Sequence, residues 1–236
     1  MAQRNVVFQG KSDILFDLDG TLVDSVPDLA SAVNVMLTQL EREHFSEEII
    51  RSWVGNGAKT LVERALSGQR DIASDLDADY AAKALAIFLD AYQQHACVDT
   101  VLYPNVKKTL AELKQGGYQL HIVTNKPLVF VAPILENLGI DSYFKHVLGA
   151  DSLAEKKPHP MPLLHIANEQ KVSLESCVMV GDSHNDVLAA NAAPMDSVGL
   201  TYGYNYGENI GLHQPTAIFD HFEQLLDILP PVKNVS

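Results

Sequence analysis

Short apolar runs that end in acidic or small polar residues alternate with amphipathic stretches of helical length, and this alternation constrains the fold more than any other feature of the sequence. The apolar runs cover residues 14–16, 120–123, 147–148 and 178–180. The helical stretches cover roughly residues 106–115, 128–138, 160–170 and 185–193. Short apolar runs indicate buried strands, and their alternation with helices is typical of βαβ units. The sequence therefore predicts an α/β fold with a parallel sheet.

The segment 25–100 breaks this alternation, because it has a helical pattern throughout and contains no convincing strand. Its first helix has a plausible start, with Ser25 as N-cap, Pro27 in the first turn and Asp28 three residues after the serine. We therefore predict an inserted all-helical cap domain over 25–100, and a catalytic core made of 1–24 and 101–236. The hinges are expected near Asp24 and in the segment 98–104.

Composition and charge narrow the class of protein. The chain has 236 residues, 47% of them hydrophobic, and can bury a large core. No apolar run approaches the roughly 20 residues of a membrane helix, and the start does not resemble a secretory signal, so we expect a cytoplasmic protein without a membrane partner. Cys97 and Cys177 suit buried thiols in a reducing compartment. The net charge of −13 argues against nucleic-acid binding.

Carboxylates follow two of the predicted strands. Asp17 and Asp19 come directly after the first strand, and Asp182 and Asp186 follow the strand near residue 180. In an open parallel sheet, ligands bind at the carboxyl ends of the strands, near the point where strand order reverses. If the two strands are neighbours, four carboxylates converge and require a cation, for which Mg²⁺ with its oxygen ligands fits best. A negatively charged protein that acts on a phosphate ester also needs such a cation, together with a few Lys or Arg residues.

Four motifs that occur in order resemble the signatures of haloacid dehalogenase-type phosphatases. The first is the stretch 17–25, Asp-Leu-Asp-Gly-Thr-Leu-Val-Asp-Ser; the second is Thr124-Asn125-Lys126, the third is Lys157-Pro158, and the fourth is the stretch 181–186, Gly-Asp-Ser-His-Asn-Asp. The resemblance covers nearly the whole chain and implies a Rossmann-like core with a helical cap between the first and second motifs. It also implies a phosphatase that depends on Mg²⁺.

The chemistry of these residue types agrees with that activity, since a carboxylate can attack phosphorus and form an aspartyl-phosphate. Asp17 is the expected nucleophile, and Asp19 is the expected general acid and then base. The resemblance implies that Thr124 and the backbone near Asn125 bind phosphate oxygens while Lys157 neutralises charge. Asp17 and Asp182 are the expected direct ligands of the metal, the resemblance implies that the backbone carbonyl of Asp19 joins them, and Asp186 is expected to act from outside through water or a hydrogen bond.

Each motif also has an ordinary structural interpretation. Asp17 and Asp19 could be turn residues, and Asp186 could form a helix capping box with Ser183. Thr124 and Asn125 could cap the next helix, and Lys157 could be a surface lysine beside Lys156. Four ordered motifs favour the catalytic interpretation, and for Asp186 both roles can hold at once.

The cap must select the leaving group, because core residues contact mainly phosphate and metal. Gly55, Asn56 and Gly57 predict a tight loop that opens a helix, whose free N–H groups favour an anion; a plain helix–helix turn is the alternative. The stretch 54–58 with Arg64 resembles the cap of bacterial phosphoglycolate phosphatases, so Gly55, Asn56, Gly57 and Arg64 are expected to contact a small anionic ester, 2-phosphoglycolate. Pro194 departs from that family, which usually has glycine there.

Three alternatives stay open. The first is another capped phosphatase, or a mutase, for a different small ester such as a sugar phosphate. The second is phosphonoacetaldehyde hydrolase, a related family that needs a cap lysine to form a Schiff base, for which the cap offers Lys59 and Lys83. The third is a catalytically silent binding protein on the same fold. The sequence leaves open whether the chain forms a homo-oligomer.

Overall fold

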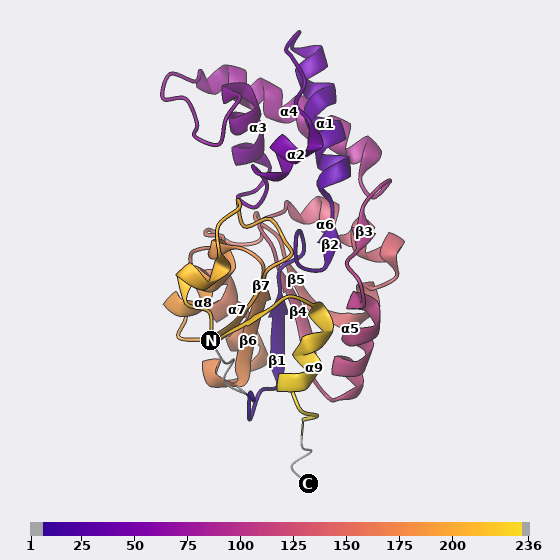
Figure 1. Cartoon of the computed structure of the whole chain (residues 1–236), viewed down its shortest axis with the longest axis vertical. Coiled ribbons are helices and arrows are strands. Elements are labelled where there is room, and N and C mark those ends of the chain that lie inside the picture. Colours follow the sequence, from indigo (N-terminus) through magenta and orange to yellow (C-terminus); the bar gives the residue numbers. More distant parts are fainter. Residues whose placement is uncertain (1–6, 233–236) are drawn as a thin grey trace.

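The computed structural model describes residues 7–232, and the parts of the predicted core at 1–6 and 233–236 lie outside the described residues. A six-stranded parallel sheet with the order β5-β4-β1-β6-β7-β8 forms the lower half of the molecule in Figure 1. Its strands are β1 Asp13–Phe16, β4 Gln119–Val123, β5 Phe144–Leu148, β6 Cys177–Gly181, β7 Asp196–Leu200 and β8 Ala217–Phe219. The predicted α/β class with a parallel sheet is confirmed.

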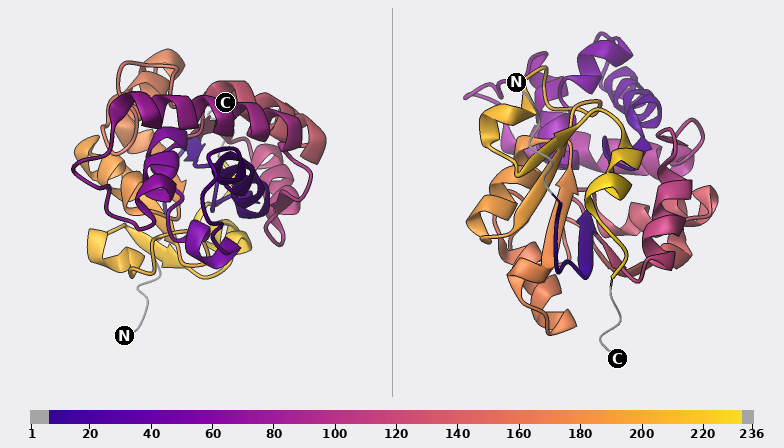
Figure 2. Two further views of the ribbon diagram at one scale, coloured as in Figure 1. Left: turned by 90° about the horizontal axis from the view of Figure 1, so that it is seen from above. Right: turned by 60° about the horizontal axis from the view of Figure 1, so that its bottom comes forward.

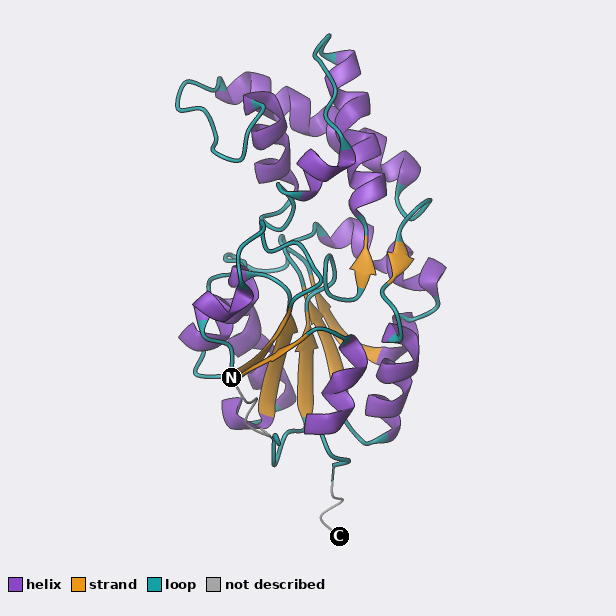
Figure 3. Ribbon diagram, in the orientation of Figure 1, coloured by secondary structure: helices purple, strands orange, loops and turns teal. Residues whose placement is uncertain are grey.

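Helices cover both faces of this sheet, as Figure 3 shows. They are α5 Val106–Gln115, α6 Leu128–Leu138, α7 Met161–Gln170, α8 His184–Ala192 and α9 Leu225–Ile228. Side chains of α5, α6 and α9 pack with Phe16 and Ile122 on one face. Side chains of α7 and α8 pack with Leu15 and Met179 on the other face. Alternating residues of one strand therefore serve two cores, as expected when a sheet is buried on both sides.

The four remaining α-helices form a separate layer over the carboxyl ends of the strands (Figures 1 and 2). They are α1 Val26–Gln39, α2 Glu47–Arg51, α3 Ala58–Ser67 and α4 Ala78–His95, and short 3₁₀ turns at Asp141–Tyr143, Leu174–Ser176, Ile210–His213 and Phe222–Gln224 complete the helical structure. Residues 25–100 are all described, and none of them lies in a strand. The helical layer has its own apolar core, to which Phe130 of α6 and Tyr204 of the loop after β7 also contribute.

Two short antiparallel strands connect the helical layer to the sheet. They are β2 Val23–Asp24 and β3 Val101–Leu102, and Val23 pairs with Leu102. This ribbon lies at the predicted cap boundaries, where the chain leaves the core and returns to it. No helix within residues 7–232 is long and apolar enough to cross a membrane.

The central position of β1 fixes where the site forms. Phe16 pairs with Ile122 of β4 on one side and with Val180 of β6 on the other. The residues that follow these three strands therefore meet at one edge of the sheet, and this edge faces the helical layer. The order of the strands reverses here, which is where ligands bind in open α/β sheets.

Candidate active site

Asp17 occupies the carboxyl end of the central strand. Its Oδ1 accepts a hydrogen bond from the backbone N–H of Leu18 at 2.7 Å, and the same atom lies 3.0 Å from Nζ of Lys157. Burial raises the pKa of Asp17 to about 7; Lys157 opposes this rise, whereas Asp186 and Asp19 add to it. A carboxylate held in this way requires further positive charge nearby to remain ionised.

Lys157 lies beneath Asp17 with only 1% of its surface exposed. Its ammonium donates to the carbonyl of Val123 and to Oδ1 of Asp186, the latter at 2.7 Å, and contacts Asp17. The two carboxylates outweigh the effect of burial and raise the pKa of Lys157, so the side chain is positively charged. The interpretation of Lys157 as a surface lysine is therefore wrong.

Asp182 is enclosed on several sides after β6. Its Oδ1 accepts a hydrogen bond from the Thr21 hydroxyl at 2.6 Å, and its Oδ2 accepts one from the backbone N–H of Tyr204 at 2.7 Å. A Cβ atom at Gly20 or Gly203 would lie 2.3 Å or 2.2 Å from Oδ2. Burial, followed by repulsion from Asp186 and Asp17, raises the pKa of Asp182 well above its usual range.

Asp186 takes part in the capping box considered from the sequence and also contacts Lys157. Its Oδ2 accepts hydrogen bonds from the backbone N–H and the hydroxyl of Ser183, at 3.0 Å and 2.8 Å, and the first of these belongs to the capping box of α8. Its Oδ1 accepts the hydrogen bond from Lys157. The residue therefore fixes both the start of the helix and the position of the buried ammonium.

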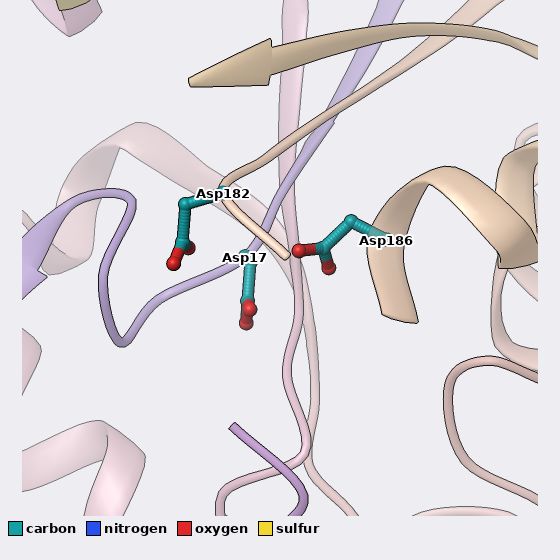
Figure 4. A group of neighbouring side chains, drawn as sticks. All are labelled: Asp17, Asp182 and Asp186. Atoms are coloured by element: carbon teal, nitrogen blue, oxygen red, sulfur yellow. The ribbon is translucent and has the colours of Figure 1, made fainter. Parts of the chain in front are cut away.

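Figure 4 shows these carboxylates converging from two segments: the end of β1 carries Asp17, and the stretch from β6 into α8 carries Asp182 and Asp186. One carboxylate oxygen from each lies within 4.8 Å of the others. The raised pKa values of Asp17 and Asp182 indicate that these carboxylates lack sufficient positive charge, although Lys157 lies beside them. Hard oxygen donors with excess negative charge fit a divalent cation such as Mg²⁺.

The side chain of Asp19 points to a different set of partners. Its Oδ1 accepts a hydrogen bond from the Ser25 hydroxyl at 2.6 Å, and its two oxygens lie 3.0 Å and 3.2 Å from Nζ of Lys126. Ser25 does stand at the N-cap position of α1, but its hydroxyl serves Asp19 instead of capping the helix. The prediction that Ser25 and Asp28 cap this helix through their side chains is therefore wrong. Asp28 instead accepts hydrogen bonds from the backbone N–H groups of Asp99 and Thr100.

Sequence reasoning assigned no role to Lys126, which lines the pocket and contacts Asp19. Only 5% of its surface is exposed, and its Nζ lies 4.8 Å from the centroid of the Tyr92 ring. Burial alone would lower the pKa of Lys126, but Asp19 and Tyr92 together outweigh it and raise the pKa, so the residue is charged. The sequence did contain a signal for Lys126, because it lies three residues after the end of β4. Ligands bind at the carboxyl ends of the strands in an open parallel sheet, which applies to Lys126 as it does to Thr124.

Thr124 and Asn125 form hydrogen bonds with other residues of the site and do not cap α6. The hydroxyl of Thr124 accepts a hydrogen bond from the backbone N–H of Lys126, and Nδ2 of Asn125 donates to the carbonyls of Lys157 and Gly55. The first N–H of α6, at Leu128, donates instead to Asp151. The capping interpretation of Thr124 and Asn125 is therefore wrong.

A pocket of about 490 Å³, including space open to solvent, separates the sheet edge from the helical layer. On the sheet side it is lined by Asp17, Asp19, Thr124, Asn125, Lys126, Pro127 and Phe130. On the opposite side it is lined by Leu29, Val54, Gly55, Gly57, Ala58, Leu61, Phe88 and Tyr92. The two sides differ in chemistry, because charge is concentrated on the sheet side and apolar side chains dominate the other.

The predicted cap residues divide between the pocket and its support. Gly55 and Gly57 line the pocket, whereas the described lining residues do not include Asn56 or Arg64. Asn56 accepts hydrogen bonds from the Tyr206 hydroxyl and, through its carbonyl, from Lys156. The guanidinium of Arg64 donates to the carbonyls of Trp53 and Arg70. Arg64 therefore braces the loop in this structure and does not face the pocket.

Comparisons with known proteins identify the family of this chain. Residues 14–200 match the family described as haloacid dehalogenase-like hydrolase. A phosphoglycolate phosphatase from Colwellia psychrerythraea is 55% identical over 92% of this chain and 96% of its own length, and one from Vibrio parahaemolyticus is 48% identical over 92% and 95%. The crystal structure of a predicted phosphoglycolate phosphatase from Haemophilus somnus matches with a TM-score of 0.86 and 41% identity, over 93% of this chain and 98% of that one. The chain belongs to the haloacid dehalogenase-like hydrolase family.

Proposed function

We propose that this protein is a Mg²⁺-dependent phosphatase that hydrolyses 2-phosphoglycolate to glycolate and phosphate. The reaction class rests on Asp17, a carboxylate at the end of the central strand, 3.0 Å from the Lys157 ammonium and grouped with Asp182 and Asp186. The choice of substrate is supported by the relatives named phosphoglycolate phosphatase, which are 55% and 48% identical to this chain over more than nine-tenths of its length.

In this proposal Asp17 attacks phosphorus and forms an aspartyl-phosphate, while the bond from phosphorus to the glycolate oxygen breaks. Asp19 lines the same pocket and donates a proton to the departing oxygen. It then accepts a proton from the water that attacks the phosphorus of the aspartyl-phosphate, which releases phosphate and regenerates Asp17. The contacts of Asp19 with Ser25 and Lys126 hold its carboxyl group toward the pocket during both steps.

Lys157 and Thr124 would stabilise the phosphoryl group during its transfer. The Lys157 ammonium contacts the oxygen of Asp17, so its charge is present where negative charge accumulates. Thr124 and Asn125 line the pocket beside Asp17, where the Thr124 hydroxyl and the backbone N–H of Asn125 can bind phosphate oxygens. The carbonyl of Lys157 is itself held by Asn125, which fixes the second and third motifs relative to each other.

Asp17, Asp182 and the backbone carbonyl of Asp19 would hold Mg²⁺, with Asp186 outside the coordination sphere. Asp186 accepts three hydrogen bonds, one of them from the Lys157 ammonium, whereas each oxygen of Asp182 accepts one from a neutral donor; this difference supports the outer position of Asp186. Bound Mg²⁺ would neutralise the carboxylates and the transferring phosphoryl group. The cradle formed by Thr21, Gly20 and Gly203 orients Asp182 for this purpose.

The cap side of the pocket supports a small substrate. A sugar phosphate carries several hydroxyl groups, and each needs a hydrogen-bond partner when it is buried. The side chains that the cap contributes here are mostly apolar, including Leu29, Leu61 and Phe88. This lining favours a compact leaving group such as glycolate over a sugar.

The Schiff-base alternative receives little support from the cap lysines. Lys59 has 74% of its side chain exposed and lies 3.8 Å from Glu63 on the same helix, and Lys83 is also exposed. Neither is among the described residues that line the pocket. A lysine that forms a Schiff base with a bound aldehyde must reach that pocket.

We also propose a cytoplasmic location. Cys97 and Cys177 are free thiols, which suits a reducing compartment.

The test is phosphate release from 2-phosphoglycolate and from a panel of sugar phosphates and phosphoserine, with Mg²⁺ or with a chelator. We expect a Mg²⁺-dependent preference for 2-phosphoglycolate, and a loss of turnover of at least about 10³-fold in Asp17→Asn, because an amide is a poor nucleophile. The Asp17→Asn protein should keep its circular dichroism spectrum.

Each failure has a separate meaning. Faster turnover of another ester would reject 2-phosphoglycolate as the substrate while keeping the reaction. Unchanged turnover in Asp17→Asn would reject the nucleophile. Absence of turnover with every ester would favour the silent binding protein.

A further inference from the structure

The carboxylate of 2-phosphoglycolate needs a partner that the phosphate site does not supply. This group lies one methylene away from the ester oxygen, and the protein that must admit it has a net charge of −13. A carboxylate that leaves water for a pocket lined by Asp17 and Asp19 requires a cation. Among the described residues that line the pocket, Lys126 alone carries a basic side chain.

Other basic side chains near the site have different partners. The Lys157 ammonium contacts three acceptors, namely Val123, Asp17 and Asp186. Arg64 donates to two backbone carbonyls of the cap, and Lys156 donates to the carbonyl of Asn56. Redirecting any of these cations would break contacts that hold the site or its cap together.

Lys126 is already arranged to bind a carboxylate. Its Nζ lies 3.0 Å and 3.2 Å from the two oxygens of Asp19 and 4.8 Å from the centroid of the Tyr92 ring. With 3% of its side chain exposed, the ammonium is shielded from bulk water, which strengthens its pairing with an anion. Asp19 is also the group that would contact the ester oxygen, so the ammonium lies close to where the substrate carboxylate must be.

We propose that Lys126 binds the carboxylate of the leaving group and thereby determines the preference for 2-phosphoglycolate, an inference that rests on the proposed function. Nζ exchanges one of its two contacts with Asp19 for a carboxylate oxygen of the substrate. The other contact keeps Asp19 beside the ester oxygen. The Tyr92 ring stabilises the ammonium through a cation–π contact.

The experiment compares 2-phosphoglycolate with ethyl phosphate, in which a methyl group replaces the carboxylate. The readout is kcat/KM for 2-phosphoglycolate divided by kcat/KM for ethyl phosphate. A general effect on Asp19 changes both values and cancels in this ratio. In Lys126→Met we expect this ratio to fall about 10- to 150-fold, as for the loss of a buried charge-assisted hydrogen bond. Lys126→Arg, which keeps the charge, should retain more of the ratio than Lys126→Met does.

Lys145→Met is the matched control, because Lys145 is exposed on β5 and donates to Gln170 at 2.7 Å. Its ratio should equal that of the wild type. A second measurement needs no variant. For the wild type, kcat/KM for 2-phosphoglycolamide, in which an amide replaces the carboxylate, should also be about 10- to 150-fold lower than kcat/KM for 2-phosphoglycolate.

Two results would overturn the inference alone: a wild type that prefers 2-phosphoglycolate but accepts the amide equally well, or a Lys126→Met protein whose ratio is unchanged. A wild type that prefers a sugar phosphate to 2-phosphoglycolate would instead overturn the proposed substrate, and the inference with it.

Discussion

At the scale of single residues, the space around Asp182 depends on two glycines. Gly20 has a φ of +88°, and a Cβ atom there would lie 2.3 Å from Oδ2 of Asp182. Gly20→Ala must therefore displace a carboxylate that is proposed to hold Mg²⁺. We expect the Mg²⁺ concentration for half-maximal activity to rise about 10- to 100-fold, the effect typical of disturbed metal-site surroundings.

Gly10→Ala separates this clash from the cost of backbone strain. Gly10 has a similar φ of +72°, but a Cβ atom there would meet nothing within 4 Å. Both variants should lose about 1–2 kcal/mol of unfolding free energy from the left-handed backbone. The Mg²⁺ titration should shift in Gly20→Ala alone, and equal titration curves for the two variants would contradict the proposed role of Asp182.

Residue identity at the strand ends was predictable, but the pairing of side chains was not. Asp17, Lys157 and Asp182 come together as the ordered motifs predicted, because parallel pairing brings strand ends to one edge. The contact between Lys126 and Asp19 depends on how the chain turns after each strand. A sequence pattern with a period of two or 3.6 residues carries no information about such turns.

At the scale of elements, the cap loop 54–57 contacts the core through specific atoms. The Gly55 carbonyl accepts hydrogen bonds from Nδ2 of Asn125 and of Asn185, at 3.3 Å and 3.2 Å. Gly55 has a φ of +127°, and a Cβ atom there would lie 2.5 Å from the Tyr206 hydroxyl. Gly55→Ala should therefore push the loop away from the core and lower kcat/KM about 10- to 100-fold, as expected when groups that position the substrate are displaced.

Tyr206→Phe tests whether this clash is the cause. The hydroxyl oxygen is the nearest atom to the added methyl group, and the next atom of the ring lies 3.3 Å away. The double variant should therefore recover part of the activity lost in Gly55→Ala, as measured in a double-mutant cycle of kcat/KM. Additive losses would show that the backbone conformation of Gly55, and not Tyr206, controls the loop.

Element prediction succeeded where apolar residues are continuous or repeat with a helical period, and it failed where neither pattern is present. The helices predicted at 106–115 and 128–138 match α5 and α6, since their apolar faces repeat with helical period. Strand β7 was not predicted, because Ser197 and Gly199 interrupt its apolar run. Its pairing with β6 supplies the stability that its own residues lack. Strands β2 and β3 have two residues each, too few for any periodic pattern to reveal.

At the scale of the whole molecule, Asp24 connects the ribbon, the cap and the core. Its carboxylate accepts two hydrogen bonds from Arg51 of α2, both at 3.0 Å, and one from the hydroxyl of Tyr204 in the loop after β7, at 2.6 Å. Three segments of the chain therefore meet at one charged group. These hydrogen bonds connect the cap to the core, and their contribution to the unfolding free energy can be measured by substituting Asp24.

The protonation of Asp24 makes that link dependent on pH. Burial raises the pKa of Asp24, but the hydrogen bonds from Arg51 and Tyr204 outweigh burial and hold it below its usual range. A carboxyl whose pKa is lower in the folded protein stabilises the fold fully above its unfolded pKa of about 3.9, and this contribution disappears as pH falls through the folded pKa. Asp24→Asn should therefore lose about 1–2 kcal/mol of unfolding free energy at pH 7, and this deficit should shrink below about pH 4.

Urea unfolding of both proteins between pH 7 and pH 3 measures this difference directly. Glu208→Gln is the control, because Glu208 pairs with Arg70 across the same two layers at 3.1 Å but with both side chains at least 40% exposed. An exposed pair of this kind should contribute less than about 1 kcal/mol at any pH. A deficit in Asp24→Asn that is independent of pH would mean that the shape of the side chain, and not its charge, connects the cap to the core.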